Sequence, residues 1–209
     1  LTWNDAFKLA NKPFRYNLSV GLADNTSEIT KFDNPSKILS DYYVGQKLGD
    51  IWGYVVDGLF RTDEEAANYN VDQTAVNFVI NTAQVNPGLH AGDMKFVDLD
   101  GDHTISSGSN TADDPGDRKI IGNSLPRYTY SIQGGFDWYG FDFSIYLQGV
   151  GHQDWYPGTN SVFFWGPYAR PYSSFIPRDF LSQVWSPENP DAYFPRPRGY
   201  VALDVNPRE

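Results

Sequence analysis

The 209-residue chain contains no cysteine, which excludes a disulfide framework, a thiolate metal site and a cysteine nucleophile. It has no run of about 18 apolar residues, so a membrane-spanning helix is excluded, whereas a membrane-spanning strand is not. Lys and Arg number 16 against 26 Asp and Glu. This acidic balance leaves no basic surface for a nucleic acid, and we expect no nucleic-acid partner.

The sequence also lacks the usual signals of catalysis. The three histidines are scattered without the ligand spacing of a zinc site, and there is no Gly-rich phosphate loop or nucleophile elbow. Carboxylate pairs for glycoside hydrolysis are compatible with the composition, but no spacing points to one. We therefore expect that the chain is not an enzyme, and a glycan-degrading enzyme is kept only as an alternative.

Aromatic and turn-forming residues are abundant instead. Tyr, Phe and Trp make up 16% of the chain, and 19 Gly and 14 Pro separate short apolar stretches. Aromatic residues favour strands and membrane interfaces, and frequent Gly and Pro are typical of chains with many turns. The composition therefore predicts an all-β protein with little helix.

Two segments alternate between apolar and polar residues with a period of two. Residues 14–22 form one, and residues 128–148 form a hairpin whose turn is Tyr139-Gly140. The strand 128–138 is about 37 Å long, which projects to about 26 Å at a tilt of about 45° and matches the apolar band of an outer membrane. Tyr128, Trp138 and Tyr139 lie where aromatic girdles occur in such barrels. The alternative is a soluble sandwich strand with one face in a core.

An acidic loop occupies residues 98–109. Asp98, Asp100 and Asp102 match the first, third and fifth positions of a calcium-binding EF-hand loop, and Thr104 matches the seventh, where a backbone carbonyl is the ligand. The sequence therefore predicts a Ca²⁺ site at these four residues that stiffens the loop. The alternative is a solvated acidic turn without a cation.

Two positions of this loop depart from the EF-hand pattern. His103 replaces the glycine of the sharp turn, and Ser109 replaces the bidentate glutamate. The missing carboxylate can come from the following segment, at Asp113, Asp114 or Asp117.

Three further local signals concern the region around the loop. Thr62 and Glu65 have the spacing of a capping box and predict a short helix. Phe96 and Ile105 are predicted to anchor the acidic loop to a core. Pro is frequent from about residue 155 onward, which predicts a long loop there.

Aromatic residues in Gly- and Pro-rich loops are candidates for a ligand or partner surface, because flat rings stack on sugars or pack on a neighbouring protein. The alternative is that they fill the core of their own loop. The candidates are Trp52, Tyr54, Trp155 and Trp165.

Several short motifs follow one another along nearly the whole chain. They are Tyr43-Val44-Gly45-Gln46, Leu48-Gly49-Asp50-Ile51-Trp52-Gly53-Tyr54, Asp57-Gly58-Leu59-Phe60, Gly92-Asp93-Met94-Lys95-Phe96-Val97-Asp98-Leu99-Asp100-Gly101-Asp102, Asp117-Arg118-Lys119-Ile120-Ile121-Gly122-Asn123, the hairpin of 128–148, and Trp185-Ser186-Pro187-Glu188-Asn189-Pro190 with Phe194-Pro195-Arg196. In this order, the motifs resemble a late portion of the SusC/RagA-like TonB-dependent outer-membrane transporters of Bacteroidetes.

The resemblance implies a plugged barrel of about 22 strands in the bacterial outer membrane. It further implies import of glycans or peptides, a SusD-like surface lipoprotein as a lid, and energy from TonB through a plug region that this chain lacks. About 22 strands of about ten residues need more residues than this chain has, so it cannot close a barrel alone.

These inferences give an expected organisation of the chain. The fold class is all-β, with antiparallel strands of a large transmembrane β-barrel that is incomplete as given. We expect a barrel strand region at 1–40, a long extracellular loop region with the acidic loop at 41–126, a barrel hairpin at 127–152 and a Pro- and aromatic-rich loop region at 153–209.

A protein of a different class fits the same features. A secreted, calcium-stabilised β-sandwich that binds glycans would use the loop aromatics for its ligand. It would bury Tyr130, Ile132, Phe143 and Ile145 between two sheets, whereas a barrel would expose these side chains to lipid.

Overall fold

The computed structural model describes residues 1–76, 88–157 and 175–197. It is all-β with antiparallel sheets and almost no helix, as the sequence predicts. The chain divides into two compact units, and the first consists of Leu1–Thr30, Gly45–Asp50 and Gly122–Trp155. Among the described residues, no helix has the length and hydropathy of a membrane span.

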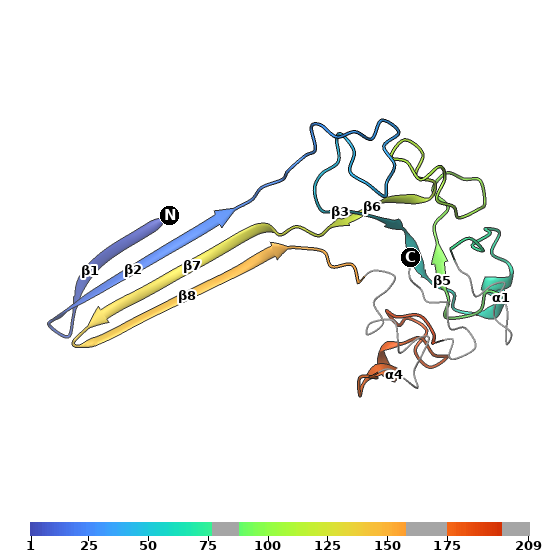
Figure 1. Cartoon of the computed structure of the whole chain (residues 1–209). Coiled ribbons are helices and arrows are strands. Elements are labelled where there is room, and N and C mark those ends of the chain that lie inside the picture. The colour runs from blue at the N-terminus through green and yellow to red at the C-terminus, as the bar shows by residue number, and fades with distance from the viewer. Residues whose placement is uncertain (77–87, 158–174, 198–209) are drawn as a thin grey trace. The chain divides into compact units, whose positions relative to one another are not determined.

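The first unit contains a four-stranded antiparallel sheet with the strand order β1-β2-β7-β8 (Figure 1). Its strands are β1 (Thr2–Leu9), β2 (Lys12–Ala23), β7 (Arg127–Trp138) and β8 (Phe141–His152). The described strands form an open sheet, because β1 and β8 are its edges and no described strand pairs with either edge. No closed barrel is therefore present in the described residues.

Two-residue turns connect β1 to β2 and β7 to β8, and both lie at the same end of the sheet (Figure 1). Ala10 and Asn11 have φ values of 51° and 62°, and Tyr139 and Gly140 have 49° and 85°. Positive φ at both turn residues is the geometry whose twist matches that of paired antiparallel strands. The Tyr139-Gly140 turn is the one that the sequence predicts.

The remaining described secondary structure is short. Two two-stranded sheets pair β3 with β6 and β4 with β5. The elements are β3 (Asp50–Tyr54), β4 (Val56–Leu59), α1 (Asp63–Ala67), β5 (Met94–Phe96), β6 (Arg118–Asn123) and α4 (Phe180–Gln183).

A small core lies beside the acidic loop. Tyr54, Phe96 and Ile105 are buried against one another. The predicted anchors are confirmed, because Phe96 is 2% exposed and Ile105 is 0% exposed. The fully buried Gln73 joins the core by donating to the Met94 carbonyl and accepting the Phe96 N–H. This core gives the loop a fixed base, since a buried amide with both partners resists displacement.

Helix α1 starts where the capping box predicts. The Thr62 hydroxyl accepts the Glu65 N–H at 3.1 Å. The Glu65 carboxylate returns to the Arg61 N–H at 2.8 Å, rather than to the N–H of the capping residue itself. It also pairs with Lys95 at 3.2 Å, so the helix start is joined to β5.

Candidate functional site

The strand register gives the four-stranded sheet one apolar face. Cross-strand pairs such as Val20 with Ile132 and Ile132 with Leu147 place apolar residues opposite one another. Because side chains alternate along each strand, the same face continues across all four strands. Its side chains are Trp3, Phe7 and Leu9 of β1, Phe14, Tyr16, Leu18, Val20 and Leu22 of β2, Tyr130, Ile132, Phe136 and Trp138 of β7, and Phe141, Phe143, Ile145 and Leu147 of β8.

Aromatic rings join the strands across this apolar face. The ring centroids of Phe7 and Phe14 are 5.0 Å apart, those of Phe14 and Phe136 are 5.3 Å apart, and those of Phe136 and Phe143 are 5.4 Å apart. Such pairs stabilise neighbouring strands beyond simple area burial. The face nevertheless remains open, since Ile132 is 36% exposed and Phe143 is 49% exposed.

The opposite face is polar and has two hollows. The first lies toward the turns and is lined by charged and amide side chains, including Arg15, Asn17, Gln133 and Asp137. Arg15 and Asp137 form an ion pair at 3.5 Å. Asp142 lies directly across the strands from Asp137 and adds a further carboxylate.

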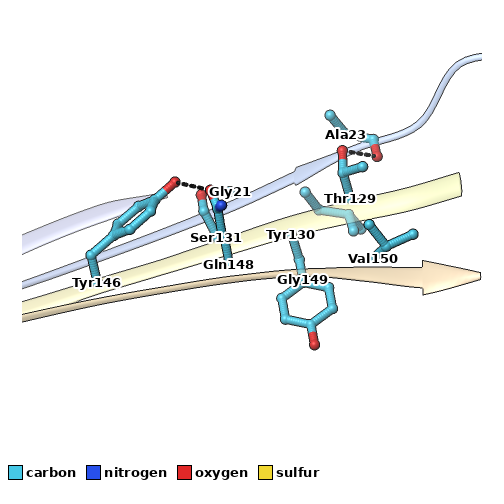
Figure 2. A pocket seen from close by; sticks show the side chains of 10 residues that line it. Gly21, Ala23, Thr129, Tyr130, Ser131, Tyr146, Gln148, Gly149 and Val150 are labelled. Carbon is cyan, nitrogen blue, oxygen red and sulfur yellow. Dashed lines mark hydrogen bonds between the residues drawn. The ribbon is translucent and has the colours of Figure 1, made fainter. Parts of the chain in front are cut away.

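The second hollow lies toward the other end of the sheet and has a volume of about 590 Å³. Tyr146, Gln148 and Ser131 border it, and the Tyr146 hydroxyl lies 3.3 Å from the Gln148 side-chain oxygen. Figure 2 shows Tyr130 directed away from these three side chains, toward the apolar face. Gly21 lies beside Ser131 and contributes no side chain of its own.

In the second unit, three carboxylates converge at the acidic loop. Asp98, Asp100 and Asp117 each offer an oxygen, and these oxygens lie within 4.8 Å of one another. Asp117 is fully buried, whereas Asp100 is exposed. Three converging carboxylates are the ligand type that Ca²⁺ prefers, although exposed acidic groups also occur without a cation.

Backbone N–H groups hold two of these carboxylates in place. Asp117 accepts the N–H groups of Leu99 and Ser106, each at 2.7 Å. Asp98 accepts the N–H groups of Gly101 at 2.6 Å and His103 at 2.9 Å. These bonds pull the loop around the carboxylates, so that Asp98 and Asp117 are linked to both halves of the loop.

The backbone conformation of the loop shows how His103 takes the place of the glycine in the EF-hand pattern. His103 stands where that pattern has glycine, yet it adopts the positive φ of 64°. A non-glycine residue in this conformation is uncommon and is held by its surroundings. The bond from its N–H to Asp98 is one such restraint.

The carboxylates of the loop differ in their electrostatic surroundings. The Asp102 N–H lowers the pKa of Asp100, but burial and the charges of Asp117, Asp102 and Asp98 outweigh this bond and raise the pKa above its ordinary value. For Asp98, burial raises the pKa, and the N–H bonds from His103 and Gly101 outweigh it, so the pKa is lowered. The surrounding carboxylates therefore oppose ionisation at Asp100, whereas backbone N–H groups favour the ionised form of Asp98.

Asp102 and Thr104 lie outside the group of three. The Asp102 carboxylate accepts the Thr104 N–H at 2.7 Å. Thr104 also forms an isolated bridge with Asp72. Asp117 supplies the third carboxylate of the group. The sequence offers it as one of three residues that could replace the carboxylate missing from the EF-hand pattern.

The candidate aromatic residues have different positions. Tyr54 is buried at 8% exposure with its ring 5.9 Å from that of Phe96, so it packs in the core of its own unit. Trp52 is half-buried, and its buried indole N–H has no hydrogen-bond partner among the described residues. Trp155 is 72% exposed. Trp165 lies outside the described residues.

Comparison with known proteins gives one informative similarity. No model of a protein family matches the chain. It is 28% identical over 160 residues to the TonB-dependent receptor P39 of Formosa agariphila, and the match covers 66% of this chain. The chain spans only 15% of that receptor's length. The similarity is therefore to a TonB-dependent receptor, and it does not distinguish a subtype among these receptors.

Proposed function

We propose that this chain forms part of the wall and the external loops of a TonB-dependent transporter in the bacterial outer membrane. The apolar face of the four-stranded sheet contacts lipid, and the polar face lines the lumen. The observation that carries the proposal is the open apolar face, which stays in register across all four strands. Alternation of lipid-facing and lumen-facing side chains is the pattern of barrel walls.

The degree of exposure favours this function over a soluble sandwich. Fully burying a Leu, Ile or Phe side chain contributes about 1.5–3 kcal/mol, so a face with many such side chains needs a cover. A sandwich supplies a second sheet. Within the described residues of this unit no second sheet packs on the face, and Tyr130 and Ile145 are each 44% exposed. Hydrocarbon is the cover that the barrel provides.

The strand length agrees with a membrane crossing. β7 and β8 have 12 residues each. At about 3.4 Å per residue and a tilt of about 45°, such a strand rises about 29 Å, enough for an apolar band of about 25 Å. Short turns face the periplasm in these barrels, so the end with the two-residue turns is periplasmic and the longer segments are external.

The proposal includes the SusC/RagA subtype, import of oligosaccharides or peptides, and a SusD-like lipoprotein as partner. Its support is the ordered set of motifs in the sequence. The similarity to the TonB-dependent receptor of Formosa agariphila supports the wider family but not the subtype. TonB would act through a plug region outside this chain. Among the candidate aromatics that the structure describes, Trp155 is the most exposed, and we propose that it contacts a ligand or partner.

A structural Ca²⁺ in the acidic loop completes the proposal. Asp98 and Asp100, with Asp117 as the third carboxylate, would hold it. The support is their EF-hand spacing together with their convergence. The cation would stiffen the external region rather than take part in chemistry, since the transporter is not an enzyme.

Cysteine labelling of β7 tests the face assignment, because the chain has no cysteine of its own. Single cysteines replace Ser131 and Gln133 on the polar face and Tyr130 and Ile132 on the apolar face of the complete membrane protein. We expect a water-soluble maleimide to label only the polar pair and a lipid-soluble maleimide to label only the apolar pair. Equal labelling of both pairs by the water-soluble reagent would contradict the proposal.

A further inference from the structure

Tyr146 is an exception on the polar face of the sheet. Its neighbours on that face of β8 are Ser144 and Gln148, yet its aromatic side chain is 60% exposed. Val150, further along the same face, is 46% exposed. Apolar surface left in water on an otherwise polar face marks a place where a ligand can cover it.

Next to Tyr146, a row of small and polar residues crosses three strands. Gly21 of β2 pairs with Ser131 of β7, and Ser131 pairs with Gln148 of β8. The Ser131 hydroxyl lies 2.8 Å from the position that a Cβ at Gly21 would take, so the glycine is what leaves the hollow open. The row places a hydroxyl and a carboxamide beside the Tyr146 ring (Figure 2).

The charge of the two hollows differs. Arg15, Asp137 and Asp142 line the hollow near the turns, whereas none of the residues that line the hollow at Tyr146 is charged. In a chain of net charge −10, this neutral stretch selects against charged groups. Its ligand therefore needs a flat apolar surface for the ring and neutral donors and acceptors for Ser131 and Gln148.

A pyranose ring has this combination, with C–H groups on its flat side and hydroxyls around its edge. We infer that the hollow at Tyr146 is a subsite for one sugar ring of a neutral oligosaccharide. The ring stacks on Tyr146, while its hydroxyls bond to Gln148 and Ser131. This inference rests on the proposed function, because that function makes the polar face the wall of the import path.

Ligand protection of a single cysteine tests the subsite. Ser131→Cys in the complete membrane protein is labelled by the water-soluble maleimide with and without a mixture of α- and β-linked neutral hexasaccharides. At about ten times the dissociation constant, labelling should slow about tenfold, because only the unoccupied fraction reacts. Asp137→Cys, in the charged hollow and four residues closer to the turn than Gln133, the cross-strand partner of Tyr146, is the control and should label at the same rate with and without sugar.

A second substitution identifies the ring. Tyr146→Ala should weaken the protection of Ser131→Cys about tenfold, whereas Tyr146→Phe, which keeps the ring, should retain most of it. The inference is overturned if the hexasaccharides do not protect Ser131→Cys, or if an uncharged Gly/Ser hexapeptide protects it and the sugars do not. Labelling of Ser131→Cys without sugar reports the face assignment separately, so a failure of the subsite is distinguishable from a failure of the proposed function.

Discussion

Asp117 is the residue on which the acidic loop depends most. It is fully buried, and its two oxygens accept the N–H groups of Leu99 and Ser106. Asp117→Asn turns one oxygen into a donor that faces an N–H group, so we expect a loss of about 1–3 kcal/mol in the free energy of unfolding. If Ca²⁺ binds here, the substitution also removes the stabilisation that added Ca²⁺ gives.

Thermal unfolding of the complete protein with and without Ca²⁺ measures both effects. Asp113→Asn is the control, since the interaction of Asp113 with the described residues is an exposed ion pair with Lys37, and its loss should change stability by about 0–1 kcal/mol. The calcium proposal is wrong if added Ca²⁺ raises the unfolding temperature of the wild-type protein and of Asp117→Asn equally, or of neither.

A glycine on the apolar face offers a second test at single-residue scale. Gly149 pairs with Tyr130 across the strands, and the Tyr130 ring lies against the position that a Cβ would take. We therefore expect Gly149→Ala to displace the end of the exposed Tyr130 ring and to weaken this cross-strand contact by about 0.2–1 kcal/mol, seen as a lower urea midpoint. Gly134→Ala is the matched control on the same face, because its nearest side-chain atom would be 3.8 Å away. Similar midpoints for both variants would show that the Tyr130 ring has another place to pack.

Among the elements, the hairpin of β7 and β8 was the part most readily predicted from the sequence. Apolar residues recur at alternate positions on both sides of a turn that contains glycine, so these signals are local. The sequence pattern does not separate β1 (Thr2–Leu9) from the rest of the expected strand region at 1–40. Asp5 interrupts its apolar face, and its turn, Ala10-Asn11, lacks glycine. A strand of this kind is defined by pairing with β2, which is a contact beyond its own sequence.

The acidic loop shows the same division between local and distant information. Asp98 and Asp100 follow from spacing within a few residues. The choice of Asp117 over Asp113 and Asp114 could not be made from the sequence, because it depends on the N–H groups that bury its carboxylate. The short strands β3 and β6 cannot be predicted in the same way, since residues about 70 positions apart in the sequence have to pair before either strand exists.

The cap of helix α1 gives a prediction about pH. The bond from the Arg61 N–H, together with Lys95, outweighs burial and holds the pKa of Glu65 below the ordinary value of 4.5. Because the pKa is lower in the folded state, the stabilisation is present above pH 4.5 and is lost as the pH falls through the lowered pKa. Glu65→Gln should therefore lower the unfolding temperature at pH 7 and make little difference at low pH.

Thr62→Ala provides the comparison for the helix cap. It removes the acceptor for the Glu65 N–H and should cost about 0.5–2 kcal/mol at either pH, because a hydroxyl does not titrate in this range. Unfolding temperatures at pH 7 and at pH 3 check both variants. A Glu65→Gln effect of equal size at the two pH values would assign the contribution of Glu65 to packing rather than charge.

For the whole molecule, the question is whether lipid or protein covers the apolar face. The two differ in how the cost of a charged substitution depends on its position along the strand. In a bilayer, an arginine on the lipid face costs about 2–4 kcal/mol at the midplane and about 0–1 kcal/mol near the interface. Leu147 lies near the middle of β8, and Phe141 lies at its turn end. We expect Leu147→Arg to lower the free energy of unfolding, measured in lipid vesicles, by about 2–4 kcal/mol and Phe141→Arg to be nearly neutral.

A facing protein layer predicts a different ranking of the two arginines. Under a second sheet, the cost follows how completely each side chain is enclosed, and the large Phe141 ring would be at least as costly to replace as Leu147, since losing a buried Phe costs about as much as losing a buried Leu. Gln148→Arg controls for charge on the polar face and should be tolerated, because it points to water in the proposed lumen. A profile in which cost follows depth in the membrane would leave hydrocarbon as the only cover consistent with both arginines.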